Sequence, residues 1–388
     1  MLRTGAPGAH GDRERVRAHG CGVRFAVVLA ATVLVPQLAG CWGGSAVPVS
    51  MCAPSACEIV PGRAYLWQTN SEGDDAHIID IASRSVVGRV VLGPQPHGIA
   101  APRLASVVYI TTEANGHPNG DLIALDSLTL EEIFRIPVGR EPHAIAVTAD
   151  GRWVYVPCRD GHYWVVDTQT RTVAARIRTD GRPHNTSISR EGRLAFLSPM
   201  GEPKRVTIVD IAAGHRVVGE IPFSASTRPP ALAADASLLF HHVDGLNGFE
   251  VADTSKRRVV ARIEHSTPLR GLYVHGKLGW LSFDGFQRCH GLAVRPGETE
   301  VWSTCGEGVT IHNGRAPFDE RSWIPLRDDA YWLTFSPDGK YAFIPIPGRR
   351  EVAMVDASAR KVVSHIPVGD GPKRNLVIVP PAPAAGAN

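Results

Sequence analysis

An aspartate that recurs at nearly constant spacing is the feature of this 388-residue chain that most constrains its fold. Each copy closes a short apolar stretch such as HIID or IALD; the copies are Asp80, Asp126, Asp167, Asp210, Asp253 and Asp356, and Asn313 fills the same place in one more. The steps between them are 46, 41, 43, 43, 60 and 43 residues. A period of about 40–45 residues is typical of propeller blades, each built of four strands. Seven copies therefore predict seven blades.

The repeat at residues 142–177 shows the four strands of one blade. Apolar segments at 144–147, 153–156, 163–166 and 172–177 alternate with turns, two of which contain Asp-Gly. Short strands separated by such turns indicate an antiparallel meander. A sheet of this kind has two apolar faces, so we expect each copy to pack between two others.

The two ends of the repeat region are complementary. The first repeat lacks a first strand before Tyr65, and residues 371–379 form a first strand with no blade behind it. We therefore predict an all-β fold, a seven-bladed β-propeller with four-stranded antiparallel blades over residues 61–379. In this prediction the C-terminal strand pairs into blade one and closes the ring, which removes two exposed sheet edges. The 60-residue step predicts an insert at 269–287.

The combination of PHGIA or PHAIA, a DGR turn, VYV, a closing Asp and IPVG resembles the YVTN-repeat family of bacterial seven-bladed propellers over residues 61–379. The stretch 289–343 is similar to the closing blades of secreted members. The resemblance implies the fold, but not an activity, because the same scaffold serves binding proteins, sugar lactonases and haem- or copper-carrying oxidoreductases. Arg159-Asp160-Gly161 followed by Asp167 is also similar to a stretch of the haem-carrying propeller of nitrite reductases; we interpret it as a generic Asp-Gly turn.

The N-terminal 40 residues have the order of a lipoprotein signal peptide. A basic start precedes an apolar run at 25–35, and Leu38-Ala39-Gly40-Cys41 follows as a lipobox. We predict lipidation of Cys41, a flexible tether over 41–60, and a disordered tail at 380–388. An ordinary secretory signal is the alternative. Either way we expect export to the cell envelope, and with the lipid, anchoring to a membrane on its periplasmic or outer surface.

The charge of the exported part argues against nucleic-acid binding. The chain has 41 basic and 38 acidic side chains, and removal of residues 1–40 takes away five Arg, one Asp and one Glu, which leaves 36 of each sign. A nucleic-acid binder needs a positive field. We expect a monomer whose ligand is a protein, peptide or glycan.

Seven cysteines are present, and Cys21 and Cys41 belong to the predicted signal and lipid anchor. Cys52 and Cys57 are close enough in sequence to pair. Cys289 opens one strand and Cys305 closes the next, so antiparallel pairing brings them to the same end of the sheet. Cys158 is left over. The chain has no CxxCH motif, so covalent c-type haem is not expected.

Several side chains are predicted to meet at one end of the central channel, which we call the channel mouth. First strands begin there, and the residues at this position are His97, His143, His184, His290, Lys373 and Tyr331, with Pro230 in blade five. The four imidazoles together with Cys158 form a candidate metal site, because imidazole and thiolate suit copper or zinc. Alternatively, Pro-His is a structural part of the repeat, and the histidines bond to the backbone of neighbouring blades.

Three functions remain open from the sequence, and it does not decide whether the protein is an enzyme. The first is a non-enzymatic binding or interaction scaffold in the cell envelope, with the insert 269–287 as contact element. The alternative is a metal- or cofactor-binding protein or oxidoreductase that holds copper, zinc or haem at the channel mouth. The third is a lactonase-like hydrolase.

Overall fold

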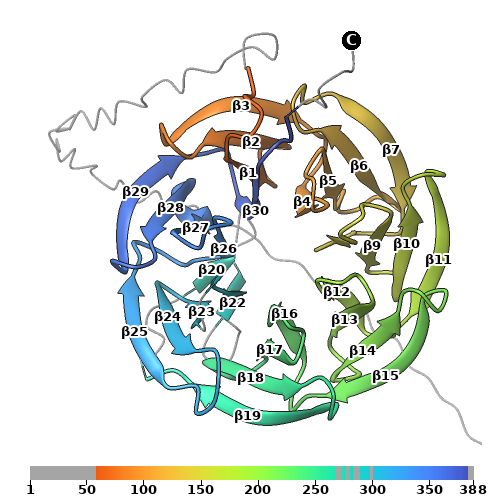
Figure 1. Cartoon of the computed structure of the whole chain (residues 1–388), viewed down its shortest axis with the longest axis vertical. Coiled ribbons are helices and arrows are strands. Elements are labelled where there is room, and N and C mark those ends of the chain that lie inside the picture. Colours follow the sequence, from red (N-terminus) through yellow and green to blue (C-terminus); the bar gives the residue numbers. More distant parts are fainter. Residues whose placement is uncertain (1–57, 267–272, 276–279, 283–288, 298–299, 383–388) are drawn as a thin grey trace, which may run out of the picture. The chain divides into compact units, whose positions relative to one another are not determined.

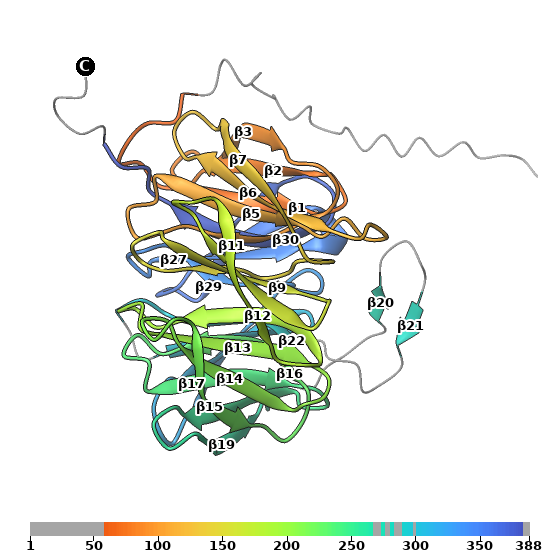
Figure 2. The same cartoon turned by 90° about the vertical axis from the view of Figure 1, so that its right-hand side faces the viewer.

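Seven four-stranded antiparallel sheets surround a central channel, which confirms the predicted seven-bladed β-propeller (Figure 1). The computed structural model describes residues 58–266, 273–275, 280–282, 289–297 and 300–382. In the view turned by 90° (Figure 2), the sheets are twisted, as antiparallel sheets normally are. The described residues contain one 3-10 turn, η2 (Pro347–Arg349), and otherwise strands and loops, as the repeat predicted.

Each blade runs from an inner strand at the channel to an outer strand at the rim. From the inner to the outer strand, blade one contains β30 (Pro372–Ile378), β1 (Tyr65–Asn70), β2 (Asp75–Asp80) and β3 (Ser85–Val91), and blade two contains β4 (Pro96–Ala100), β5 (Val107–Thr112), β6 (Gly120–Asp126) and β7 (Glu132–Val138). Blade three contains β8 (Ala146–Val147), β9 (Trp153–Cys158), β10 (His162–Asp167) and β11 (Thr172–Arg178), blade four contains β12 (Arg182–Ile188), β13 (Leu194–Met200), β14 (Arg205–Asp210) and β15 (Arg216–Pro222), and blade five contains β16 (Thr227–Leu232), β17 (Leu238–Val243), β18 (Gly248–Asp253) and β19 (Arg258–Glu264). Blade six contains β22 (Cys289–Val294), β23 (Glu300–Cys305), β24 (Gly308–Asn313) and β25 (Glu320–Pro325), and blade seven contains β26 (Thr334–Phe335), β27 (Tyr341–Ile346), β28 (Glu351–Asp356) and β29 (Lys361–Pro367).

The recurring aspartate holds the turn between the third and fourth strands. The carboxylate of Asp80 accepts hydrogen bonds from the backbone amides of Ala82 and Ser83, at 3.3 and 3.1 Å. Asp126 accepts from the amides of Leu128 and Thr129 in the same way, both at 2.8 Å. A side chain that bonds to the backbone two and three residues ahead fixes a tight turn. The periodicity in the sequence is therefore a periodicity of turns.

Apolar side chains from neighbouring blades fill the space between the sheets. Trp67 and Ile78 of blade one pack with Val108 and Ile123 of blade two, and all four are fully buried. Burial of each such side chain contributes on the order of 1.5–3 kcal/mol. No blade covers both of its own faces, so the ring is the smallest unit that completes the core.

The ring is closed by its own ends, as predicted. β30 pairs antiparallel with β1, with Tyr65 opposite Ile378 and Trp67 opposite Leu376. The closing strand β30 begins at Pro372, so residues 372–375 belong to the strand together with the apolar residues that follow them.

The inner strand of blade three is shorter than the predicted 144–147. β8 contains two residues, because the amide of Ala144 donates to the carbonyl of His184 in the next blade, at 3.1 Å, instead of to its own sheet. Ala144 and Asn185 form a parallel bridge. This contact draws the inner edges of blades three and four together.

Between blades five and six the chain contains an extra two-stranded sheet, β20 (Tyr273–His275) and β21 (Trp280–Ser282), within the predicted insert. The side chains of the insert lie outside the described residues. So do the predicted signal peptide at 1–40, Cys41, the tether up to residue 57 with Cys52 and Cys57, and residues 383–388. In the described part of the chain, no helix is long and apolar enough to cross a membrane.

We predict that a chain ending at Gly371 loses most of its stability, because β1 then exposes a sheet edge and the apolar side of Leu66 and Trp67. Thermal unfolding followed by circular dichroism should show a midpoint lowered by more than about 10 °C. The matched control ends at residue 382, which keeps the bond from the Gly62 amide to the Pro380 carbonyl. Equal midpoints for the two truncations would contradict ring closure by β30.

Candidate functional site

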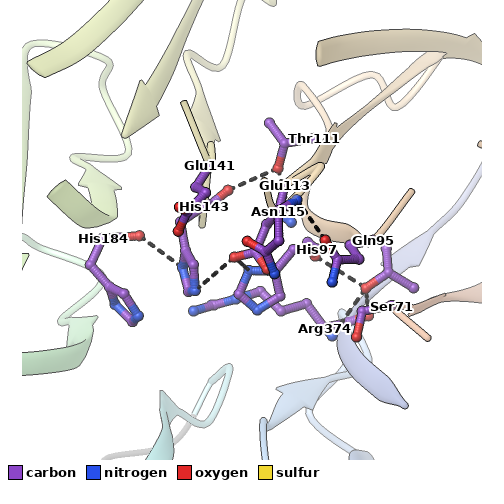
Figure 3. A network of polar contacts seen from close by, with 12 residues as sticks. Ser71, Gln95, His97, Thr111, Glu113, Asn115, Glu141, His143, His184 and Arg374 are labelled. Atoms are coloured by element: carbon purple, nitrogen blue, oxygen red, sulfur yellow. Dashed lines mark hydrogen bonds and ion pairs between the residues drawn. The ribbon is translucent and has the colours of Figure 1, made fainter. Parts of the chain in front are cut away.

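Three of the four predicted histidines lie in contact at the channel mouth (Figure 3). The ring centres of His97 and His143 are 3.8 Å apart, edge to face, and those of His143 and His184 are 3.8 Å apart and stacked. All three side chains are at least nine-tenths buried. His290 is half-buried, and its ring centre lies 6.3 Å from that of His184. The first strands of blades two, four and six, together with the segment before β8 in blade three, thus bring four imidazoles into one arc.

Hydrogen bonds decide which nitrogen of each ring carries the proton. Nδ1 of His143 lies 3.2 Å from the carbonyl oxygen of His184, which can only accept, so Nδ1 is the protonated nitrogen. Nδ1 of His184 donates in the same way to the side-chain oxygen of Asn185. In neutral rings this leaves Nε2 of both histidines without a proton, and Nε2 of His143 faces a carboxylate oxygen of Glu113. A bare imidazole nitrogen is the form that binds a metal.

Glu113 lies between His97 and His143. Its Oε1 is 3.2 Å from Nδ1 of His97 and 3.4 Å from Nε2 of His143. The Glu113 carboxylate can only accept, so the proton of His97 lies on Nδ1, and its Nε2 accepts from the hydroxyl of Tyr331 at 3.0 Å. One ligand atom of each of His97, Glu113 and His143 lies within 4.8 Å of the other two, close enough to hold one metal ion.

The other predicted residues of the channel mouth surround Tyr331. The rings of His290 and Tyr331 stack at 4.0 Å, and the ammonium of Lys373 lies 4.5 Å from the centre of the Tyr331 ring. Nδ1 of His290 is buried and has no hydrogen-bond partner among the described residues. Pro230 lines the channel from blade five.

Burial keeps these imidazoles neutral. It lowers the pKa of His143, His184 and His290 well below the ordinary value of 6.5, and the nearby charge of Arg374 lowers them further. Burial also lowers the pKa of His97, which Glu113 partly offsets. At neutral pH the arc therefore offers uncharged nitrogen donors.

Cys158 lies apart from this arc. Its side chain is buried in the apolar layer between blades two and three, and its Sγ is 3.6 Å from the carbonyl of Val156. Burial raises the pKa of this thiol well above its usual value. Cys289 and Cys305 form the disulfide that their positions predicted, and Cys158 is the free cysteine of the described residues.

Two further groups have the spacing of metal ligands in the described part of the chain. His242 lies beside Cys289 and Cys305, whose sulfurs are bonded to each other. In the other group, Ser303 donates to His265, His265 donates to His312, and His312 donates to the carbonyl of Phe318, each at 2.9 Å. Both ring nitrogens of His265 and both of His312 therefore take part in hydrogen bonds, and we interpret this group as a structural network.

Two residues of the site, Glu113 and Arg374, were not predicted from the sequence. Glu113 follows the second strand of blade two, as Arg159 does in blade three, and that turn lies at the channel mouth. Its place in this turn was the feature of the sequence that could have identified Glu113 as a residue of the site. Arg374 is the neighbour of the predicted Lys373, and its side chain extends beneath the histidines in Figure 3.

The Arg159-Asp160-Gly161 stretch forms a turn, as the sequence indicated. Asp160 accepts from the amide of His162 at 3.1 Å and from the indole of Trp164 at 2.9 Å. Gly161 has a φ of +88°, which favours glycine.

The family model of the cytochrome D1 haem domain matches residues 106–227, which include His143 and His184. No curated protein matches the chain. The YVTN-repeat resemblance remains a prediction.

Solved structures share the fold. Hydrazine synthase of Kuenenia stuttgartiensis is 21% identical, with a TM-score of 0.57 over 71% of this chain and 87% of that one. The dihydro-haem d1 dehydrogenase NirN, solved in complex with DHE, is 15% identical, with a TM-score of 0.59 over 83% and 76%. A protein of unknown function from Desulfotomaculum acetoxidans is 12% identical, with a TM-score of 0.65 over 81% and 99%. At these identities the likeness shows the fold alone.

We predict that acid destabilises the protein through the neutral histidines. The unfolded chain takes up a proton at each imidazole near pH 6.5, whereas the folded chain takes it up only at lower pH. Stability is therefore present above about pH 6.5 and falls below it, by about 1.4 kcal/mol per pH unit for each such histidine. Urea unfolding between pH 7.5 and 5.5 measures this slope.

His184→Gln should make the slope shallower by about one proton, and His117→Gln, which changes an exposed residue, should leave it unchanged. The same slope in wild type and His184→Gln would show that His184 is charged in the folded state.

Proposed function

We propose that this protein binds a haem-type tetrapyrrole at the channel mouth of an exported propeller. The observation that carries the proposal is the arc of buried, neutral imidazoles, in which Nε2 of His143 and Nε2 of His184 carry no proton. An imidazole nitrogen of this kind is the usual protein ligand of haem iron. The match to the cytochrome D1 haem domain over 106–227 supports the same chemistry.

Other side chains suit the carboxylates and the flat ring of a tetrapyrrole. Arg374 and Lys373 place two positive charges beside the arc, and Nε and Nη2 of Arg374 are buried without a hydrogen-bond partner in the described structure. Tetrapyrrole carboxylates would pair with these charges. The stacked rings of His290 and Tyr331 offer a flat face beside them.

When bound, the haem would supply an iron centre for ligand binding or electron transfer. The protein's own part is to hold neutral donors in place: Tyr331 and Glu113 favour the proton of His97 on Nδ1, and the His184 carbonyl fixes that of His143. Burial excludes water from the nitrogen atoms. These features suit a carrier and an oxidoreductase alike.

We rank this function above the interaction scaffold, whose predicted contact element at 269–287 has side chains outside the described residues. It also ranks above the lactonase-like hydrolase. Copper or zinc at His97, Glu113 and His143 is the second candidate, because those three residues have the spacing of metal ligands. Export and lipidation at Cys41 remain part of the proposal.

The test is titration of the full chain with iron protoporphyrin IX and with haem d1, followed by the Soret band. We expect saturation at one equivalent of at least one of them. His143→Ala and His184→Ala should each weaken binding by tenfold or more or change the spectrum of the bound form, and His117→Ala, on the surface, should do neither. Elemental analysis of the purified protein checks for copper and zinc.

Absence of a saturable spectral change with both tetrapyrroles would overturn the haem assignment. Stoichiometric copper or zinc that is lost in His97→Ala would replace it with the second candidate.

A further inference from the structure

The central channel contains a cavity of about 290 Å³ that is lined by the innermost segments of all seven blades. Apolar residues such as Ile99, Ala231 and Leu292 form only part of its wall. Its polar lining residues include Asn185, Asn375 and Arg374. Arg374 is 4% exposed, so its charge lies inside the ring and not on its surface.

One edge of this guanidinium is open. Nε and Nη2 of Arg374 are both buried, and neither has a hydrogen-bond partner among the described residues. These two nitrogens form the edge with which arginine holds two oxygens at once. Arg63 uses the same edge in this protein: its Nε donates to Oδ1 of Asp80 at 2.8 Å, and its Nη2 donates to Oδ2.

The open edge is held in a fixed position. The Arg374 amide donates to Oγ1 of Thr69 at 3.1 Å, and its carbonyl accepts from the side chains of Gln68 and Thr69 at 3.1 and 3.0 Å. The guanidinium carbon lies 3.7 Å from the ring centre of Trp332. An arginine that is stacked and anchored in this way has already lost its conformational freedom, which favours binding at the edge.

The charge has no acidic partner at this edge. Glu113 lies against the neutral rings of His97 and His143, and although its charge favours the charged form of Arg374, no carboxylate forms an ion pair with Arg374 in the described part of the chain. Burial lowers the pKa of Arg374 to about 10, so the side chain is still charged at neutral pH. Lys373 adds a second positive charge nearby. A buried charge without a partner is unfavourable, and an anion would remove that cost.

We propose that the central channel is an anion site, in which Nε and Nη2 of Arg374 bind two oxygens of a compact oxyanion or a carboxylate. A cavity of about 290 Å³ is at the small end for ligand pockets, which suits a ligand, or ligand group, of few heavy atoms. The inference stands on the unpartnered edge of Arg374 itself, and a tetrapyrrole carboxylate is one of the anions that this edge could hold.

The experiment measures thermal unfolding of the full chain during titration with acetate, sulfate and inorganic phosphate, with chloride adjusted to keep the ionic strength constant. A ligand that binds only the folded state raises the midpoint in a saturable way. We expect saturation with at least one of the three anions, and isothermal titration calorimetry should give one site.

Arg374→Lys keeps the charge but removes the two-nitrogen edge, and should weaken binding by at least tenfold. Arg374→Met should abolish the effect and, without added anion, should unfold no earlier than wild type, because it removes an unpaired buried charge. The matched control is Arg176→Lys: Arg176 lies 3.7 Å from the Trp164 ring centre, but on the exposed outer strand, so the anion response should not change.

A wild-type midpoint that does not depend on any of the anions would overturn the proposal, as would an unchanged response in Arg374→Lys. Competition identifies the source of the anion. If the carboxylate belongs to a tetrapyrrole, iron protoporphyrin IX displaces the bound anion and its dimethyl ester does not; if the anion is separate, neither displaces it. Failure of the haem titration leaves the anion titration interpretable on its own.

Discussion

Pairing of β30 with β1 is the interaction on which both the fold and the site depend. The apolar faces of every blade are covered only by neighbouring blades, so the core is complete only when the last strand joins the first sheet. The same strand carries Lys373 and Arg374 to the inner wall of the ring. Thr69 and Gln68 of β1 hold the carbonyl of Arg374 there. Closure of the ring and assembly of the channel are therefore one event.

Burial has opposite effects on the two kinds of basic side chain in the channel. It makes His143 and His184 neutral, so that their lone pairs are available, but it cannot neutralise Arg374 at physiological pH. The positive charge of Arg374 in turn favours neutral imidazoles around it. The result is a site with uncharged nitrogen donors on one side and a fixed cation on the other, which suits a ligand that contains both a metal and an anionic group.

The architecture could be predicted from the sequence because the residue that repeats is one that holds the same turn in each blade. Asp80 and its equivalents fix a turn that every blade needs, and the histidines converge because they share one place in the repeat. Features without a counterpart in other blades could not be predicted in this way. Glu113 matters because its carboxylate lies between two imidazoles, and Arg374 because one edge of it has no partner; both depend on side-chain geometry across the ring. The short β8 was missed because the bond from Ala144 to His184 joins different blades.

The location of Arg374 also sets the order of events during biogenesis. Strands β1 to β29 precede it in the chain, so a nascent polypeptide has its imidazoles before it has the guanidinium. A ligand that needs both would be retained only after β30 has been synthesised. If the channel binds such a ligand, a product that terminates before Arg374 would be left empty.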